Sequence, residues 1–137
     1  MSKKSLEVVI KGLIYATFFV PLLVVPSSFI FPFIVPKILL FRSLTELIIA
    51  LYALLLVINW QEYRPKPSFL MWAVLAFFLS FTISTFFGTD GYHSFWDNHE
   101  RMLGLFTIFH YIAYFFICAQ VFKSWTEWRT ALKIFLL

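Results

Sequence analysis

Residues 93–105 read HSFWDNHERMLGL and bring two His, two acids, an Arg, an Asn and a Trp together. Such a polar stretch is typical either of a loop that crosses between helices or of a segment that contacts a substrate. Asp97 is a good N-cap residue, and Glu100 three positions on completes a pattern like a capping box. Trp96 fits an aromatic anchor at a membrane interface. The local pattern therefore favours a helix entrance, and four polar residues have no such explanation: His93, Asn98, His99 and Arg101.

A second candidate lies in PKILLFRSLTELI, where Lys37, Arg42 and Glu46 interrupt an apolar run. At ~1.5 Å per residue from Phe33, they lie roughly 6, 14 and 20 Å along a helix. Lys37 can reach the interface, whereas a charge at the centre of a membrane helix costs ~2.5–3.5 kcal/mol. Arg42 and Glu46 are four residues apart and share a face on which they can pair. Lys37 points about 140° away from Arg42.

Two interpretations of these charges stay open. One is a structural ion pair of Arg42 with Glu46, buried between helices. The other is a cationic site, open to the outer side, for an anionic headgroup or phosphate, because a guanidinium binds two oxygens at once. If Glu46 neutralises Arg42, Lys37 and Arg101 become the better phosphate partners.

Polar residues recur at helical spacing further along the chain: Thr107, His110, Tyr111, Tyr114 and Cys118. Polar residues of membrane helices turn toward protein, so this stripe predicts a helix–helix face, in which His110 also has the chemistry of a proton carrier. The sequence has no phosphate-cradling Gly loop, no spacing such as H-E-x-x-H or C-x-x-C, and no nucleophile elbow. We therefore predict no metal and no cofactor, and identify no catalytic residue.

The elements that must position these residues are membrane helices. Of all residues, 61% are hydrophobic and 13% charged, against about 25% charged in a soluble domain, and several apolar runs approach the ~20 residues that a bilayer requires. The formal charge of +4 is typical of cytoplasmic loops and predicts no nucleic-acid partner. The single Cys118 excludes an internal disulfide. The composition predicts an all-α integral membrane helical bundle.

The chain reads as a single membrane domain over residues 1–137. PSSFIFP (Pro26–Pro32) separates the first two spans, Pro36 is tolerated in a first helical turn, and Gly88 is a stop signal. Four spans and the start of a fifth are predicted: 8–25, 33–58, 69–87, 100–122 and the incomplete 131–137. An alternative merges residues 8–35 into one kinked helix. The end inside ALKIFLL indicates a fragment of a larger polytopic protein.

Charge distribution gives the orientation. With a cytoplasmic N-terminus, eight of the 11 Lys and Arg lie on the cytoplasmic side, and only Lys37, Arg42 and Arg101 lie on the other. This asymmetry obeys the positive-inside rule. Residues 88–99 are therefore expected to be periplasmic or extracellular.

VPLLVVPSSFIFPFIVPKILLFRSLTELI resembles the first two spans of the O-antigen ligase-like family of bacterial membrane glycan transferases and polymerases. FFGTDGYHSFWDNHERMLGLFTIFHYIAYF resembles the family's loop before the fourth span, where the pattern Ser-Phe-Trp-x-Asn-x-Glu-Arg-Met-x-Gly-Leu recurs. Here that pattern comprises Ser94, Phe95, Trp96, Asn98, Glu100, Arg101, Met102, Gly104 and Leu105. The resemblance covers essentially the whole chain.

The resemblance implies the N-terminal part of a multi-pass protein of the bacterial inner membrane, active in lipopolysaccharide or related glycan assembly. Its donor would be a glycan on polyprenyl diphosphate, and its acceptor a glycan, lipid or protein. Catalytic Arg and His residues are expected in a later loop, so the 137-residue chain is expected to be inactive alone. We expect Lys37, Arg42 and Arg101 to surround the lipid diphosphate, with a wall that comprises His93, Trp96 and Asn98. The alternative is a small non-enzymatic membrane protein, or a transporter subunit with relay groups at Arg42, Glu46 and His110.

Overall fold

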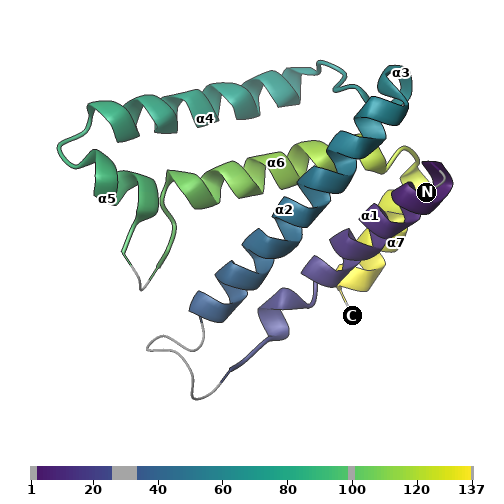
Figure 1. Cartoon of the computed structure of the whole chain (residues 1–137), viewed down its shortest axis with the longest axis horizontal. Helices are drawn as coiled ribbons and strands as arrows, with labels where there is room; N and C mark the ends of the chain where they lie inside the picture. The colour runs from purple at the N-terminus through teal and green to yellow at the C-terminus, as the bar shows by residue number, and fades with distance from the viewer. Residues whose placement is uncertain (1–2, 26–33, 99–100, 137) are drawn as a thin grey trace.

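The computed structural model describes residues 3–25, 34–98 and 101–136 (Figure 1). The described residues are all-α, with seven α-helices and a short 3-10 helix, η1 (Val20–Leu22). The α-helices are α1 (Lys3–Thr17), α2 (Val35–Ile58), α3 (Trp60–Tyr63), α4 (Phe69–Phe87), α5 (Gly91–Trp96), α6 (Leu105–Val121) and α7 (Trp125–Phe135).

Three helical segments are long and apolar enough to cross a membrane: Lys3–Leu22, α2 and α4, of 20, 24 and 19 residues. A bilayer core of ~30 Å needs about 20 residues of helix. The apolar α6 is shorter, at 17 residues. These segments indicate a multi-pass membrane protein.

Local signals explain the ends of α2 and α4. Pro36 lies in the first turn of α2, where its missing N–H is not needed. The Ser68 hydroxyl caps α4 by accepting a hydrogen bond from the Met71 N–H at 3.2 Å. Gly88 directly follows the last residue of α4. The predicted range 69–87 is confirmed, and the second span ends at Ile58 as predicted.

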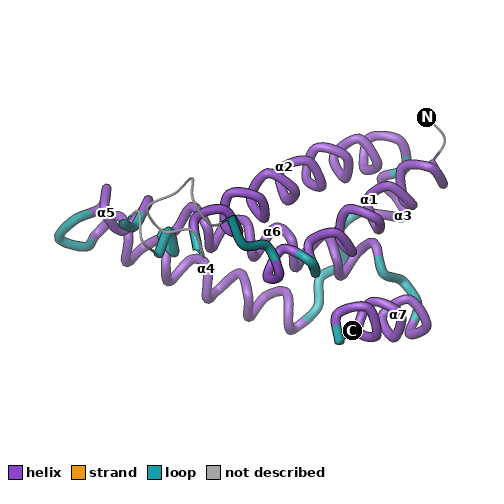
Figure 2. Tube along the Cα trace, turned by 90° about the horizontal axis from the view of Figure 1, so that it is seen from below, coloured by secondary structure: helices purple, strands orange, loops and turns teal. Residues whose placement is uncertain are grey.

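The long helices run between two ends of the molecule (Figure 1). The N-terminus, α3 and the start of α7 lie near one end, which we call the N-terminal end; α5 and the starts of α2 and α6 lie toward the other, the α5 end. The view turned by 90° separates the same two ends (Figure 2). Because α1 ends at Thr17 and packs against α2, a single kinked helix over 8–35 is wrong. Pro26–Pro32 lie outside the described residues.

The buried core lies where α1, α2, α6 and α7 meet. Its members are mainly aliphatic and include Leu6, Ile10, Ile14, Ile48, Leu55, Ile117, Val121 and Ala131. Thr107, His110 and Cys118 of the predicted polar stripe are also buried on α6, whereas Tyr114 is half-buried and Tyr111 is exposed, so the stripe is a packing face only in part. By contrast, the only buried residues of α4 are Met71 and Thr85.

The fourth apolar helix begins at Leu105, so the predicted start at residue 100, with Asp97 as its N-cap, is wrong. A separate short helix, α5, intervenes, and its N-cap is Asp90, which accepts a hydrogen bond from the His93 N–H at 2.9 Å. Asp97 follows the end of α5 with a φ of 61°. Glu100 lies outside the described residues, and the capping box that it was predicted to complete with Asp97 is wrong as well, because the N-cap of α6 is Gly104.

The last helix begins earlier than predicted, at Trp125 rather than Ala131. Ser124 and Glu127 form a reciprocal capping box, which satisfies backbone N–H groups at the helix start. Lys11 contacts Glu127 at 2.5 Å, and the rings of Phe18 and Phe135 lie 5.6 Å apart. These two contacts show that α7 runs beside α1 in the same direction.

A polar network that the sequence did not predict ties the N-terminal end together. Lys11 bridges Glu7 at 2.7 Å and Glu127 at 2.5 Å, and the fully buried Tyr63 donates its hydroxyl hydrogen to Glu7 at 2.6 Å. The Tyr52 hydroxyl donates to the Tyr63 carbonyl at 2.5 Å. Helices α1, α2, α3 and α7 are thereby joined by side-chain hydrogen bonds.

Candidate functional site

Arg42 is the most buried charged residue of the described chain, with 7% of its surface exposed. Its Nη2 donates to the Met102 carbonyl at 3.1 Å and to the Thr107 hydroxyl. Its guanidinium carbon lies 4.9 Å from the centre of the Phe106 ring, within range of a cation–π interaction. The first turn of α6 and the segment before it therefore hold Arg42 in place.

The predicted pair of Arg42 with Glu46 does not form. Within the described residues, Glu46 lies 3.3 Å from His110, and no carboxylate forms an ion pair with Arg42. Arg42 and Glu46 do lie on one face of α2, as predicted. Helix α6 packs on that face and supplies each of these two residues with a different partner. The guanidinium is held by a carbonyl, a hydroxyl and a ring, and its positive charge is not neutralised by these contacts.

A cavity of about 290 Å³ lies beside Arg42 at the α5 end. Its lining comes from α2, from α5 and from the α5–α6 connection: Arg42, Tyr92, Trp96, Asp97, Asn98 and Met102. Arg42 Nε is buried and has no hydrogen-bond partner among the described residues. Nearly all buried polar groups have a hydrogen-bond partner, so an unpaired Nε on a residue that lines the cavity is an exception.

The connection beside Arg42 is shaped by its own polar side chains. Asp97 accepts a hydrogen bond from the Leu103 N–H at 2.8 Å, and the Asn98 side chain accepts one from the Arg101 N–H at 2.9 Å. The backbone N–H groups of Leu103 and Asn98 lower the pKa of the Asp97 carboxyl. Asp97 and Met102 both have positive φ, at 61° and 51°. These features reverse the chain so that Met102 reaches Arg42.

Gly104 permits close contact between the end of α5 and the start of α6. A Cβ at this position would lie 2.3 Å from the Phe95 carbonyl oxygen and 2.7 Å from the carbonyl carbon of Trp96. No side chain fits against backbone atoms at that distance. Packing therefore requires a glycine at position 104. The backbone conformation does not require one, because a φ of −61° is accessible to any residue.

Trp96 belongs to an aromatic cluster under the cavity. Its ring centre lies 5.1 Å from that of Phe106 and 4.9 Å from that of Phe95. Phe106 is also the ring that contacts Arg42. The motif residues Phe95 and Trp96 thus connect to the buried guanidinium through one shared ring.

Three of the predicted site residues come together at the cavity: Arg42, Trp96 and Asn98. His93 and Arg101 are exposed and do not line it, and Lys37 lines a different cavity, between α1, α2 and α6. The cavity residues that the sequence missed include Tyr92, which lies in the stretch before the motif. Thr107 was expected only to pack, yet it is the residue that anchors Arg42.

Glu46 and His110 form a second polar pair, inside the apolar region. His110 is 2% exposed; its Nδ1 lies 2.7 Å from the Phe106 carbonyl and its Nε2 lies 3.3 Å from Glu46. A carbonyl only accepts, so Nδ1 carries a hydrogen, and Nε2 of a neutral ring is then an acceptor. A hydrogen bond to Glu46 requires one further proton, on the ring or on the carboxyl.

No group of three or more His, Cys, Asp or Glu that could hold a metal ion occurs in the described part of the chain. The fold and the site define a multi-pass membrane protein with a buried, unneutralised Arg beside a cavity at one end. In comparisons with known proteins, no family model matches this chain, and no curated protein or solved structure is significantly similar to it.

Proposed function

We propose that this chain is the N-terminal portion of an O-antigen ligase-like glycan transferase, which moves glycan from a polyprenyl-diphosphate carrier to an acceptor. The proposal rests on the sequence motif over 94–105 and on one structural observation. That observation is the buried Arg42, which lines a cavity with Trp96 and Asn98 of the same motif and keeps an unused Nε donor.

The chemistry of this cavity suits a diphosphate. A guanidinium presents its donors in a planar fork and remains charged at all physiological pH values, so it binds phosphate oxygens well. Nη2 of Arg42 is used by Met102 and Thr107 and Nε has no partner among the described residues, so the guanidinium keeps hydrogen-bonding capacity for a ligand. In this proposal Arg42 binds and orients the diphosphate, and the bond-breaking groups lie outside the described residues.

The orientation follows from the same proposal. The N-terminal end, which contains Lys3, Arg64 and Lys123, is cytoplasmic, and the α5 end faces the periplasm of a bacterial inner membrane. Helices α1, α2, α4 and α6 are then four spans, and α7 begins a fifth. The cavity opens on the side where a carrier lipid presents its glycan for transfer.

Deletion of the gene tests the function. We expect the polyprenyl-linked glycan to accumulate and the transferred product to disappear, because no other step would release the glycan. Restoring the wild-type gene should restore transfer. A deletion strain with normal carrier and product levels would refute the transferase and favour the scaffold or transporter alternative.

A matched pair of variants tests Arg42 in the restored strain. Arg42→Gln should lower transfer at least tenfold at normal membrane abundance, whereas Arg64→Gln, the same change at an exposed position of the other end, should not. Because Arg42 also anchors Met102, a second variant leaves that anchor intact: Tyr92→Ala changes an exposed cavity residue. Full activity of both cavity variants would overturn the assignment of the cavity.

A further inference from the structure

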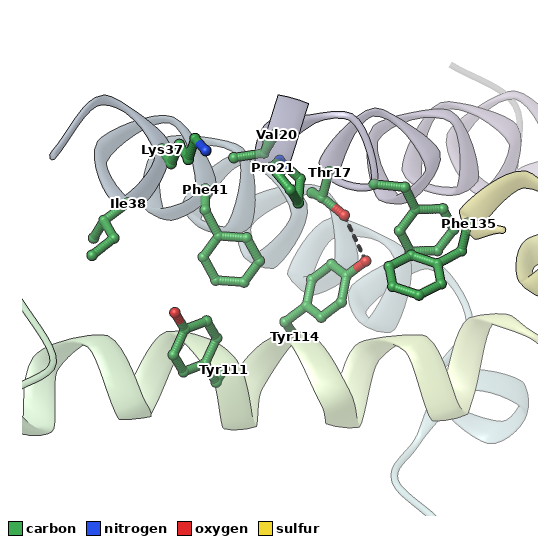
Figure 3. A pocket seen from close by; sticks show the side chains of 10 residues that line it. Thr17, Val20, Pro21, Lys37, Ile38, Phe41, Tyr111, Tyr114 and Phe135 are labelled. Carbon is green, nitrogen blue, oxygen red and sulfur yellow. Dashed lines mark hydrogen bonds between the residues drawn. The ribbon is translucent and has the colours of Figure 1, made fainter. Parts of the chain in front are cut away.

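A second cavity, of about 410 Å³, shares no lining residue with the Arg42 cavity. Its walls are apolar and aromatic and come from α1, η1, α2, α6 and α7 (Figure 3). The Phe41 ring centre lies 5.1 Å from that of Tyr111 and 5.5 Å from that of Tyr114. The volume falls within the range of ~300–1,000 Å³ that is common for small-molecule sites.

The one charged residue of the cavity lining is Lys37; its other polar groups are the side-chain hydroxyls of Thr17, Tyr111 and Tyr114. Lys37 lies at the side near Val20 and Pro21, and Phe135 closes the opposite side (Figure 3). The Tyr114 hydroxyl within the cavity is engaged by the Thr17 hydroxyl at 2.7 Å, so it is not left for a ligand. Within the described residues, no carboxylate pairs with Lys37.

This polarity follows the depth in the membrane. Lys37 is the third residue of α2, so it lies ~3 Å from the helix start at the α5 end. Tyr114 lies nine residues after Leu105, or ~14 Å from the same end along α6. In a bilayer that α2 and α6 span, the cation would therefore lie at the interface and the aromatic walls within the hydrocarbon layer, as the head and the tail of a lipid do.

We propose that this cavity binds one phospholipid with an anionic headgroup, with its phosphate at the Lys37 ammonium and an acyl chain between Phe41, Tyr111 and Tyr114. An apolar hollow in the hydrocarbon layer offers water no hydrogen bonds, so a lipid chain fills it. The interfacial ammonium selects an anionic head over a zwitterionic one. Because the two cavities share no residue, this lipid is a different molecule from the anion at Arg42, and the proposal does not depend on the proposed function.

The test is lipid retention by the purified chain in nanodiscs that contain equal amounts of phosphatidylglycerol and phosphatidylcholine, measured by native mass spectrometry after release. An interfacial Lys contributes about 1 kcal/mol toward an anionic lipid, so we expect phosphatidylglycerol to be retained roughly fivefold over phosphatidylcholine. Lys37→Gln should abolish this preference. The matched control Lys66→Gln, an exposed Lys at the N-terminal end, should keep it.

A second variant separates binding from charge. Ile38→Trp fills the cavity and leaves Lys37 in place, so it should abolish retention of both lipids. A wild-type chain that retains no lipid, an equal preference in wild type and Lys37→Gln, or unchanged retention by Ile38→Trp would each overturn the proposal. Loss of the preference in Lys66→Gln would do so as well, because the selectivity would then reside at the other end.

Discussion

Gly104→Ala should destabilise the protein although it adds a single methyl group. That group would lie 2.3 Å from the Phe95 carbonyl oxygen, whereas close carbon–oxygen contacts lie at ~3.3 Å or more. The last turn of α5 must therefore move by roughly 1 Å away from the start of α6. The obstructing atoms are backbone and cannot rotate away, so we expect a loss of about 1–3 kcal/mol in the free energy of unfolding, the range of overpacked sites.

The chain offers a matched control in Gly12→Ala. Gly12 is an exposed residue of α1, and a Cβ there meets no atom within 4 Å. An alanine in a helix interior is favoured over glycine by roughly 0.5–1 kcal/mol, so this variant should gain stability. The same chemical change is thus expected to have opposite signs at the two positions.

Reversible unfolding in mixed detergent micelles, followed by tryptophan fluorescence, measures both variants against the wild type. Gly104→Ala should also weaken the anchor of Arg42, because Met102 lies two residues before the displaced glycine. If Gly104→Ala were as stable as the wild type, or if both variants shifted in the same direction, the close contact between α5 and α6 would be refuted.

Two further perturbations test polar pairs. Hydrogen bonds from Lys123, at 2.5 Å, and from Lys3 lower the pKa of Glu62 from 4.5 to about 2. A carboxyl whose pKa is lowered by folding stabilises the fold at pH values above 4.5. We therefore expect the free energy of unfolding to fall as the pH drops from 4.5 to about 2. Other carboxyls, including Asp97 and Glu127, also have lowered pKa values and contribute to the same slope. Glu62→Gln should therefore reduce the slope without removing it, and an unchanged slope would contradict the assignment. For the inner pair, ¹⁵N NMR of His110 should find a hydrogen on Nδ1 in the wild type and in Glu46→Gln, because the Phe106 carbonyl can only accept; a neutral ring protonated only on Nε2 would contradict the hydrogen bond from Nδ1 to Phe106.

The sequence predicted the long helices because their ends depend on local signals. Pro36, Ser68 and Gly88 act within one turn of the boundaries they set, and the bounds of α4 were predicted to the residue. The start of α7 followed the same rule, since Ser124 and Glu127 stand three apart in the order of a capping box. The polar residues around them concealed that signal, so the predicted fifth span began only at Ala131.

The α5–α6 connection could not be predicted from local signals. Asp97 is a frequent N-cap residue, and nothing in its neighbours indicates a positive φ. The Asp97 carboxylate accepts a hydrogen bond from the N–H of Leu103, six residues later in the chain. The helix that Asp97 was expected to cap begins only at Leu105. Similarly, spacing revealed that Arg42 and Glu46 share a face, but only the packing of α6 decides which partner each one has.

The partners of Arg42 decide what this residue can do. A buried charge in a membrane helix costs ~2.5–3.5 kcal/mol or more, and a carboxylate partner would offset that cost at the expense of the charge. Here the offset comes from neutral groups 60 and 65 residues away in sequence, the Met102 carbonyl and the Thr107 hydroxyl, and from the face of Phe106. Dipoles and a ring stabilise a guanidinium without cancelling its charge. A site built in this way keeps its attraction for an anion in the adjoining cavity, whereas a structural salt bridge at the same depth would not.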